Sequence, residues 1–217
     1  MVQQRSAVSP ISPQAPGEPP TTKGRSTRQR LIAAATSLFE ENGYARVRVA
    51  DIAKRAGLSQ GAFYRYFTDR RALMLELMRQ LTTDAFDFVR VPWDGTDPMS
   101  SVLRSTQLYF EYYAAHRALF GLLVELSQTD PDVGQIWADS RRVFYARIAH
   151  SLRRGTHAGK LRVDVDVDVA AELLGSMTEF YAFQRFVLRD GVVKDVPAEE
   201  GADVLARIWT AGLMRQQ

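Results

Sequence analysis

Gln60 and Arg65 lie five positions apart, and each carries a side chain that can form two parallel hydrogen bonds. In the major groove of DNA, an amide pairs in this way with adenine and a guanidinium with guanine. Gly61 and Ala62 lie between them, and their small size would let the backbone approach a base edge or a thymine methyl group. These residue types therefore predict a surface that reads base sequence.

Neighbouring side chains suit the phosphate oxygens of DNA, contacts that position a helix without reading sequence. The candidates carry hydroxyl, phenol or guanidinium groups and are Ser59, Tyr64, Tyr66, Arg70 and Arg48. Lys54 and Arg55 fit phosphate contact and plain solvation equally well. Phe63 and Phe67 are four positions apart, so we expect them to face the core on the opposite side of the same helix.

Two short helices around a tight turn must hold these groups. Apolar Ile52 lies on the buried side of the first, and Gly57 can take the left-handed conformation that ends it. The Ser59 hydroxyl is a good cap for the second helix, and Asp69 can cap the helix that follows. A preceding helix is predicted over Thr27–Asn42 from its apolar spacing. Such a unit places the second helix of the pair in the major groove.

The charge distribution agrees with binding to phosphates. Residues 23–71 contain eleven Lys and Arg against four Asp and Glu, whereas the tail before them is neutral. The rest of the chain must be acidic, because the net charge of the whole is only +3. A basic unit beside an acidic one favours DNA binding by the first alone.

Residues 27–75 resemble the DNA-binding domain of the tetracycline-repressor (TetR) family. The matching segments are LIAAATSLFEENGYARV, ADIAKRAGLSQGAFYRYF and DRRALMLEL. The resemblance implies a ligand-responsive transcriptional regulator, most often a repressor, and supports Gln60, Gly61, Ala62 and Arg65 at groove-facing positions. Arg48 departs from the family, which usually has a Thr there to cap the second helix, because an Arg side chain cannot cap in that way.

The chain is expected to divide into a flexible, Pro-rich tail over residues 1–22, a DNA-binding domain over 23–71 and a ligand-binding and dimerisation domain over 72–217. The fold class is all-α with about nine helices. Alternating Val and Asp over 163–169 have the period of a strand, but a lone strand would have no partner, so Asp166 is interpreted as a helix cap. The six helices of the body are expected at about 70–89, 98–115, 117–127, 132–154, 167–189 and 198–214.

One DNA-binding unit contacts only half of a binding site. Recognition of a full DNA sequence therefore needs two such units one helical turn apart, roughly 34–36 Å. The last two predicted helices are broadly apolar, and in the family such helices from two subunits form a four-helix bundle. The residues expected at this homodimer interface are Leu173, Leu174, Met177, Tyr181, Val204, Ile208 and Gly212. The same residues would also suit the core of one subunit.

The middle helices are dense in aromatic rings, which leave irregular gaps when helices pack around them. We expect an effector pocket with Tyr109, Tyr113, Trp137, Tyr145, Phe180 and Gln184 in its walls. The body is similar to an actinobacterial subgroup of the family, which implies a small-molecule effector that is long and either apolar or aromatic. The alternative is a filled aromatic core in a regulator that responds to no ligand.

Several other functions find no support in the sequence. No Ser-His-Asp order, glycine-rich phosphate loop or paired carboxylate motif stands out, which disfavours an enzyme with a vestigial DNA-binding head. The three His are scattered and there is no Cys, so neither a metal nor another cofactor is predicted. No apolar run is long enough for a bilayer and no export signal is visible, so we expect a cytoplasmic protein without a membrane partner.

Overall fold

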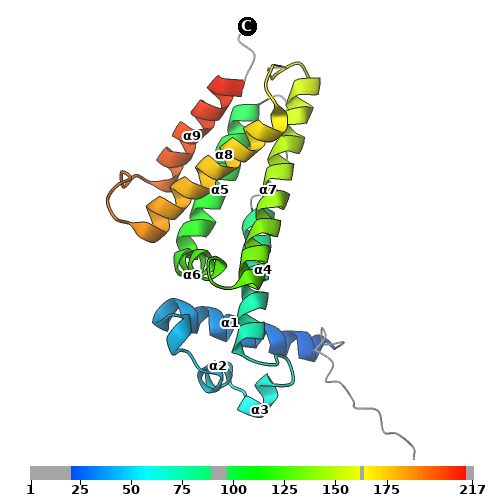
Figure 1. The fold of residues 1–217 in the computed structure, drawn as a ribbon, viewed down its shortest axis with the longest axis vertical. Helices are drawn as coiled ribbons and strands as arrows, with labels where there is room; N and C mark the ends of the chain where they lie inside the picture. Colours follow the sequence, from blue (N-terminus) through cyan, green and yellow to red (C-terminus); the bar gives the residue numbers. More distant parts are fainter. Residues whose placement is uncertain (1–20, 89–96, 162–163, 214–217) are drawn as a thin grey trace, which may run out of the picture. The chain divides into compact units, whose positions relative to one another are not determined.

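The computed structural model describes residues 21–88, 97–161 and 164–213. These residues form nine α-helices (Figure 1), which confirms the predicted all-α class. The chain divides into two compact units, Met1–Met74 and Leu75–Gln217. The predicted tail lies outside the described residues up to position 20, and so does most of the loop expected over 92–98.

The N-terminal unit contains three helices and the start of a fourth. In order they are α1 (Thr22–Asn42), the short 3-10 helix η1 (Tyr44–Arg46), α2 (Val49–Arg55), α3 (Gln60–Phe63) and α4 (Arg70–Phe88). Helix α1 begins five residues before the predicted start, because the Thr21 hydroxyl accepts a hydrogen bond from the Gly24 amide at 3.1 Å. It ends at Gly43, as predicted, where φ is 75°.

The turn between α2 and α3 has the predicted geometry. Gly57 is left-handed with φ of 66°, and Ser59 Oγ accepts from the Ala62 amide at 3.1 Å. Asp69 Oδ1 accepts from the Ala72 amide at 2.7 Å and so caps α4. Helix α2 lacks a side-chain cap from Arg48, but the Asp51 carboxylate accepts from the Arg48 backbone amide at 2.9 Å. Of the two hydrogen bonds of a capping box, the one from the N-cap amide to the N3 carboxylate is therefore present, and the one to the N-cap side chain is missing.

The C-terminal unit contains the remaining helices: α5 (Pro98–Ala115), α6 (Arg117–Ser127), α7 (Pro131–His157), α8 (Val167–Ala182), the π-helix η2 (Phe183–Leu188) and α9 (Ala198–Leu213). Helix α5 packs along α9 and α7 packs along α8 (Figure 1). Asp166 caps α8 as predicted, since its carboxylate accepts from the amides of Asp168 and Val169. Throughout the described ranges, every helix is too short or too polar to cross a bilayer.

The helix predicted over 167–189 is divided in the structure. Regular α-helix ends at Ala182, and a six-residue π-helix continues to Leu188 before Arg189 turns left-handed with φ of 50°. Further back, α7 and α8 approach so closely that a Cβ at Gly175 would overlap the Tyr145 ring. Aromatic stacking fills the interior beside them, with Tyr113 and Phe120 ring centroids 3.9 Å apart.

Candidate nucleic-acid interface and cavities

Helix α3 and the turn after it have one polar, exposed side and one apolar, buried side. Phe63 is completely buried and Phe67 nearly so, and the Phe67 amide donates to the Phe63 carbonyl at 3.1 Å. Gln60, in α3, and Arg65, in the turn that follows it, are exposed on the other side, as is the Tyr64 ring. The two predicted base-reading side chains are therefore accessible to a DNA groove.

Ala62 does not belong to that exposed surface. Its exposed fraction is only 6%, although we predicted it beside Gln60 and Gly61. The buried side of α3 is wider than the Phe63–Phe67 pair suggested, because Ala62 and the half-buried Tyr66 are also four positions apart. A thymine methyl contact by Ala62 is thus disfavoured, whereas Gly61 remains open.

Arg70 has a different environment from the phosphate contact predicted for it. Its guanidinium donates to the carbonyl oxygens of Tyr44 at 3.0 Å and Val47, and it lies over the Tyr44 ring at 4.2 Å. The side chain is half-buried in these contacts. Arg70 therefore ties the first turn of α4 to the η1 segment that precedes α2.

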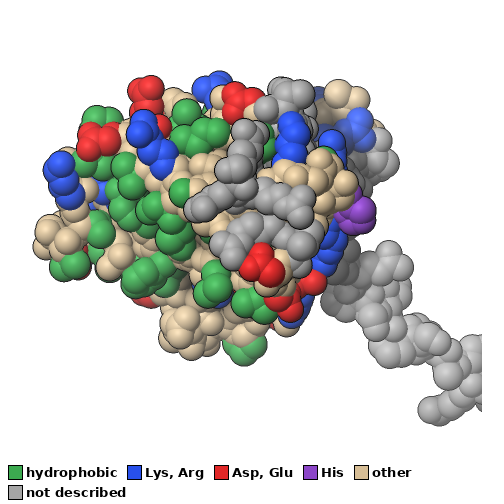
Figure 2. Space-filling view, turned by 90° about the horizontal axis from the view of Figure 1, so that it is seen from above, with side chains coloured by type: hydrophobic (Ala, Val, Ile, Leu, Met, Phe, Trp, Pro, Cys, Tyr) green, Lys and Arg blue, Asp and Glu red, His purple; other side chains and the backbone are tan. Residues whose placement is uncertain are grey.

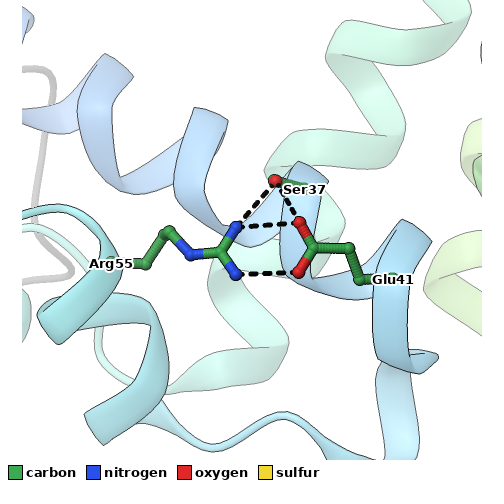
Figure 3. A network of polar contacts seen from close by, with 3 residues as sticks. All are labelled: Ser37, Glu41 and Arg55. Atoms are coloured by element: carbon green, nitrogen blue, oxygen red, sulfur yellow. Dashed lines mark hydrogen bonds and ion pairs between the residues drawn. The ribbon is translucent and has the colours of Figure 1, made fainter.

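Arg55 also holds two helices together (Figure 3). Its guanidinium makes two hydrogen bonds to the Glu41 carboxylate, at 2.9 and 2.7 Å, and a third to Ser37 Oγ at 2.9 Å. These bonds to Arg55, and then that from Ser37, lower the pKa of Glu41 to about 2. The sequence left open whether Lys54 and Arg55 contact phosphate; both are exposed, but Arg55 joins α1 to α2. Arg48 is exposed as well.

An apolar surface runs over α8 and α9. Figure 2 shows hydrophobic side chains gathered on one side of the molecule and bordered by charged ones. The large exposed residues on these helices are Val169, Leu173, Met177, Phe180, Val204 and Ile208; we call them the α8–α9 face. Four of the predicted interface residues are among them.

Two other predicted interface residues pack into their own subunit. Leu174 is partly buried against the core around Ile148 and Leu152. The Tyr181 ring lies 5.4 Å from that of Phe110. Gly212 is exposed, and a Cβ there would meet nothing within 4 Å. The sequence pattern did not separate the two sides of α8.

The C-terminal unit has a partly open cavity of about 730 Å³, lined by residues of α4, α5, α7, α8 and α9. His150 and Arg154 lie on its exposed side. Its walls are mainly apolar, with Phe86 stacked on Phe144 at 4.9 Å. Three basic side chains of α7, those of Arg147, His150 and Arg154, also line it. We call it the α5–α7 cavity. The volume lies within the range of small-molecule sites, roughly 300–1,000 Å³.

Most residues predicted in the pocket walls line a different, smaller cavity of about 550 Å³: Tyr113, Trp137, Tyr145 and Phe180. Only Tyr109 lines the α5–α7 cavity, and Gln184 lines neither. The aromatic pattern indicated that helices pack imperfectly, but it could not show which gap is larger.

Polar groups in the smaller cavity are paired with each other. The Glu179 carboxylate accepts from Arg141 Nε at 3.3 Å and from the Tyr145 hydroxyl at 3.0 Å. Burial raises the pKa of Glu179, and the Arg141 charge opposes that shift. Arg141 in turn lies 4.7 Å from the Trp137 ring. This site therefore carries no net charge.

Together, an anchored helix-turn-helix unit and a helical body define a DNA-binding transcriptional regulator rather than an enzyme. Residues 31–77 match the family model described as bacterial regulatory proteins, tetR family. The N-terminal unit of this chain is therefore similar to the DNA-binding part of the TetR family.

Similar proteins support this assignment along most of the chain. The HTH-type transcriptional regulator EthR of Mycobacterium tuberculosis is 25% identical over 187 residues, which are 84% of this chain and 85% of that protein. The repressor AcnR of Corynebacterium diphtheriae is 28% identical over 65% of this chain and 72% of its own length. A regulator of Saccharomonospora viridis, solved in complex with choline, shares the fold with a TM-score of 0.70, at 20% identity over 88% of this chain and 99% of its own.

Proposed function

We propose that this protein is a homodimeric repressor that binds an inverted repeat through α3 and is released by a small effector. The observation that supports the DNA-binding residues is the exposed surface of α3 and the turn after it. Gln60 and Arg65 lie on this surface, and Phe63 and Phe67 are buried behind it. Gln60 and Arg65 would read base edges. Phosphates would be contacted by Ser59, Tyr64 and Arg48.

The α8–α9 face supports dimerisation. Large apolar side chains recur along it at helical spacing, and Leu173 is 66% exposed although it lies in the middle of α8. Such a continuous apolar surface favours contact with another protein surface. A second copy of the chain would bury this face and supply the second DNA-binding unit. Repression is in keeping with the name of AcnR.

The α5–α7 cavity supports control by an effector. It is the larger and more apolar of the two cavities described, which makes it the better candidate for a binding site. The choline complex of the Saccharomonospora viridis regulator is a precedent for a small ligand in this fold. We therefore place the effector in this cavity and not among the aromatic residues predicted first.

Helix α4 offers a route from the cavity to DNA. Phe86, in its last turn, lines the cavity, and Arg70, in its first turn, is bonded to the segment before α2. An effector that favours one position of α4 would favour one spacing of the two DNA-binding units. It can shift that equilibrium only by its difference in affinity for the two states.

Selection of random duplexes by the purified full chain tests the DNA-binding part. The expected product is an inverted repeat whose half-sites lie about one helical turn apart, bound by one dimer. Enrichment of no sequence, or of a single half-site by monomers, would overturn the proposal.

A thermal-shift screen of apolar and aromatic compounds tests the effector part and its alternative, a regulator blind to ligands. A compound that raises the melting temperature should also release the selected duplex. Filling the α5–α7 cavity with Ser105→Phe should abolish both effects, whereas Ala138→Phe, in the smaller cavity, should leave them. The opposite pattern would move the effector to the smaller cavity, and no response to any compound would favour the alternative.

A further inference from the structure

The α5–α7 cavity has an excess of positively charged and basic side chains along α7. From this we infer that the effector is an amphipathic anion, with an acyl or aryl body and a carboxylate head that lies along α7 at His150 and Arg154. The inference rests on the proposed effector site and names its ligand class.

The charge of the cavity comes from one face of α7. Arg147, His150 and Arg154 are three and four positions apart, which puts them on the same side of the helix, and all three line the cavity. Among the described residues that line it, none is Asp or Glu. Among these described residues, an organic cation would therefore meet basic side chains and no carboxylate, whereas an anion would be attracted.

Three hydroxyls of the wall outside α7 already donate their protons elsewhere, so they offer none to an anion. The hydroxyls of Ser105, Thr178 and Thr210 donate to carbonyl oxygens of their own helices, at 2.7, 2.9 and 2.9 Å. The indole N–H of Trp209, by contrast, is buried without a hydrogen-bond partner in the described part of the chain. Because that N–H is buried within the protein, it is out of reach of a ligand in the cavity, and the basic residues of α7 are the groups that would hold an anionic head.

The remaining wall requires an apolar body. Phe86 and Phe144 stack on each other at one side, and Val102, Ile148 and Leu152 continue the apolar surface. A charged head without such a body would leave this surface in contact with water, and burying it favours a chain or ring. A ten-carbon acid is small enough for a cavity of about 730 Å³.

Three probes of equal chain length separate charge from apolarity: sodium decanoate, decan-1-ol and decyltrimethylammonium bromide, each below its micelle-forming concentration. Calorimetry on the full-length dimer should show decanoate binding roughly tenfold more tightly than decanol, since a charge-assisted hydrogen bond is worth about that factor. The ammonium compound should bind most weakly. Decanoate should also release the selected duplex.

Arg154→Gln and Arg142→Gln form a matched pair of variants. Each removes one positive charge from α7, but Arg142 is bonded to Asp139 and does not line the cavity. Arg154→Gln should weaken decanoate binding roughly three- to tenfold and leave decanol binding unchanged. Arg142→Gln should change neither. Ser105→Phe, which fills the cavity, should abolish binding of both probes while DNA binding persists.

Each other outcome overturns the inference. Equal affinities for decanoate and decanol would show an effector cavity without preference for anions, and the proposed function would then stand. The anionic head would equally be excluded from this cavity if Arg142→Gln weakens decanoate as much as Arg154→Gln does, or if Ser105→Phe still binds decanoate. Failure of all three probes would also overturn it, and the compound screen would decide separately whether the protein has an effector.

Discussion

At the scale of single residues, the neighbours of a guanidinium decide what it can do. Arg65 and Arg70 are both in or beside the helix-turn-helix motif. Arg65 is exposed, whereas the guanidinium of Arg70 already donates hydrogen bonds to backbone carbonyls. Arg55 is held in the same way by Glu41. A count of basic residues therefore overestimates the number of basic side chains that are available to contact phosphates.

Arg65→Ala should relax specificity at one base position of each half-site, because it removes a side chain that reads a base edge. The expected loss on the preferred sequence is about 1–3 kcal/mol, with little loss on non-specific DNA. Fluorescence anisotropy on the selected duplex and its single-base variants measures this, and the thermal stability should not change. Equal losses on every duplex would remove Arg65 from the base-reading set.

Arg70→Ala should weaken binding to all duplexes alike and also lower the melting temperature. The carbonyl oxygens of Tyr44 and Val47 would lose their donor, and α4 would lose its connection to the segment before α2. A phosphate contact alone would affect DNA binding without affecting the free protein. If the melting temperature of Arg70→Ala equals that of the wild type, Arg70 would instead contact phosphate, as the sequence predicted.

Gly175→Ala should destabilise the C-terminal unit by roughly 1–3 kcal/mol, because a Cβ that overlaps the Tyr145 ring forces α7 and α8 apart. Gly61→Ala is the matched control. A Cβ at Gly61 would meet only Ser59 Oγ, at 4.0 Å, so the fold should tolerate it and only DNA binding should fall. Urea denaturation of both variants measures the difference, and a Gly175→Ala variant as stable as the wild type would contradict the close packing.

At the scale of elements, the sequence predicted those features of the helices that depend on residues close together in the chain. Caps such as Ser59, Asp69 and Asp166 act within three residues of themselves, so their types and positions were sufficient. The π-helix after Ala182 and the burial of Ala62 depend on packing against distant segments. The cavity wall is a stronger case, because Phe86, Arg154 and Trp209 meet only when separate helices assemble.

The α1–α2 pair should lose stability in acid in a way that depends on Glu41. Its pKa falls from 4.5 to about 2 on folding, so the ion pair with Arg55 stabilises the fold fully above about pH 4.5. That contribution is lost as the pH falls from there towards 2. Because both side chains are substantially exposed, the expected effect is small.

Thermal melts of the wild type and Glu41→Gln at a series of pH values isolate this contribution. The wild type should melt higher at pH 7, and the gap should narrow below pH 4.5 and close near pH 2. Glu125→Gln, at an exposed position of α6, serves as the control. A gap that is independent of pH would mean that the carboxylate is not what joins the two helices.

At the scale of the whole molecule, the proposed recognition of an inverted repeat requires two copies. One α3 offers few base contacts, and two DNA-binding units in one dimer would raise the effective concentration of the second over its half-site. The α8–α9 face lies in the same unit as the α5–α7 cavity. The proposed dimer contact and the proposed effector site therefore belong to the same helical body.

Leu173→Glu should convert the dimer into a folded monomer. Under two-fold symmetry the same face meets itself, so one substitution buries two carboxylates in an apolar contact. Light scattering should report half the mass, circular dichroism should stay helical, and affinity for the inverted repeat should fall by more than tenfold. Val192→Glu is the matched control, since Val192 is 74% exposed but lies outside α8 and α9. Dissociation of the control, with an intact Leu173→Glu dimer, would place the interface elsewhere.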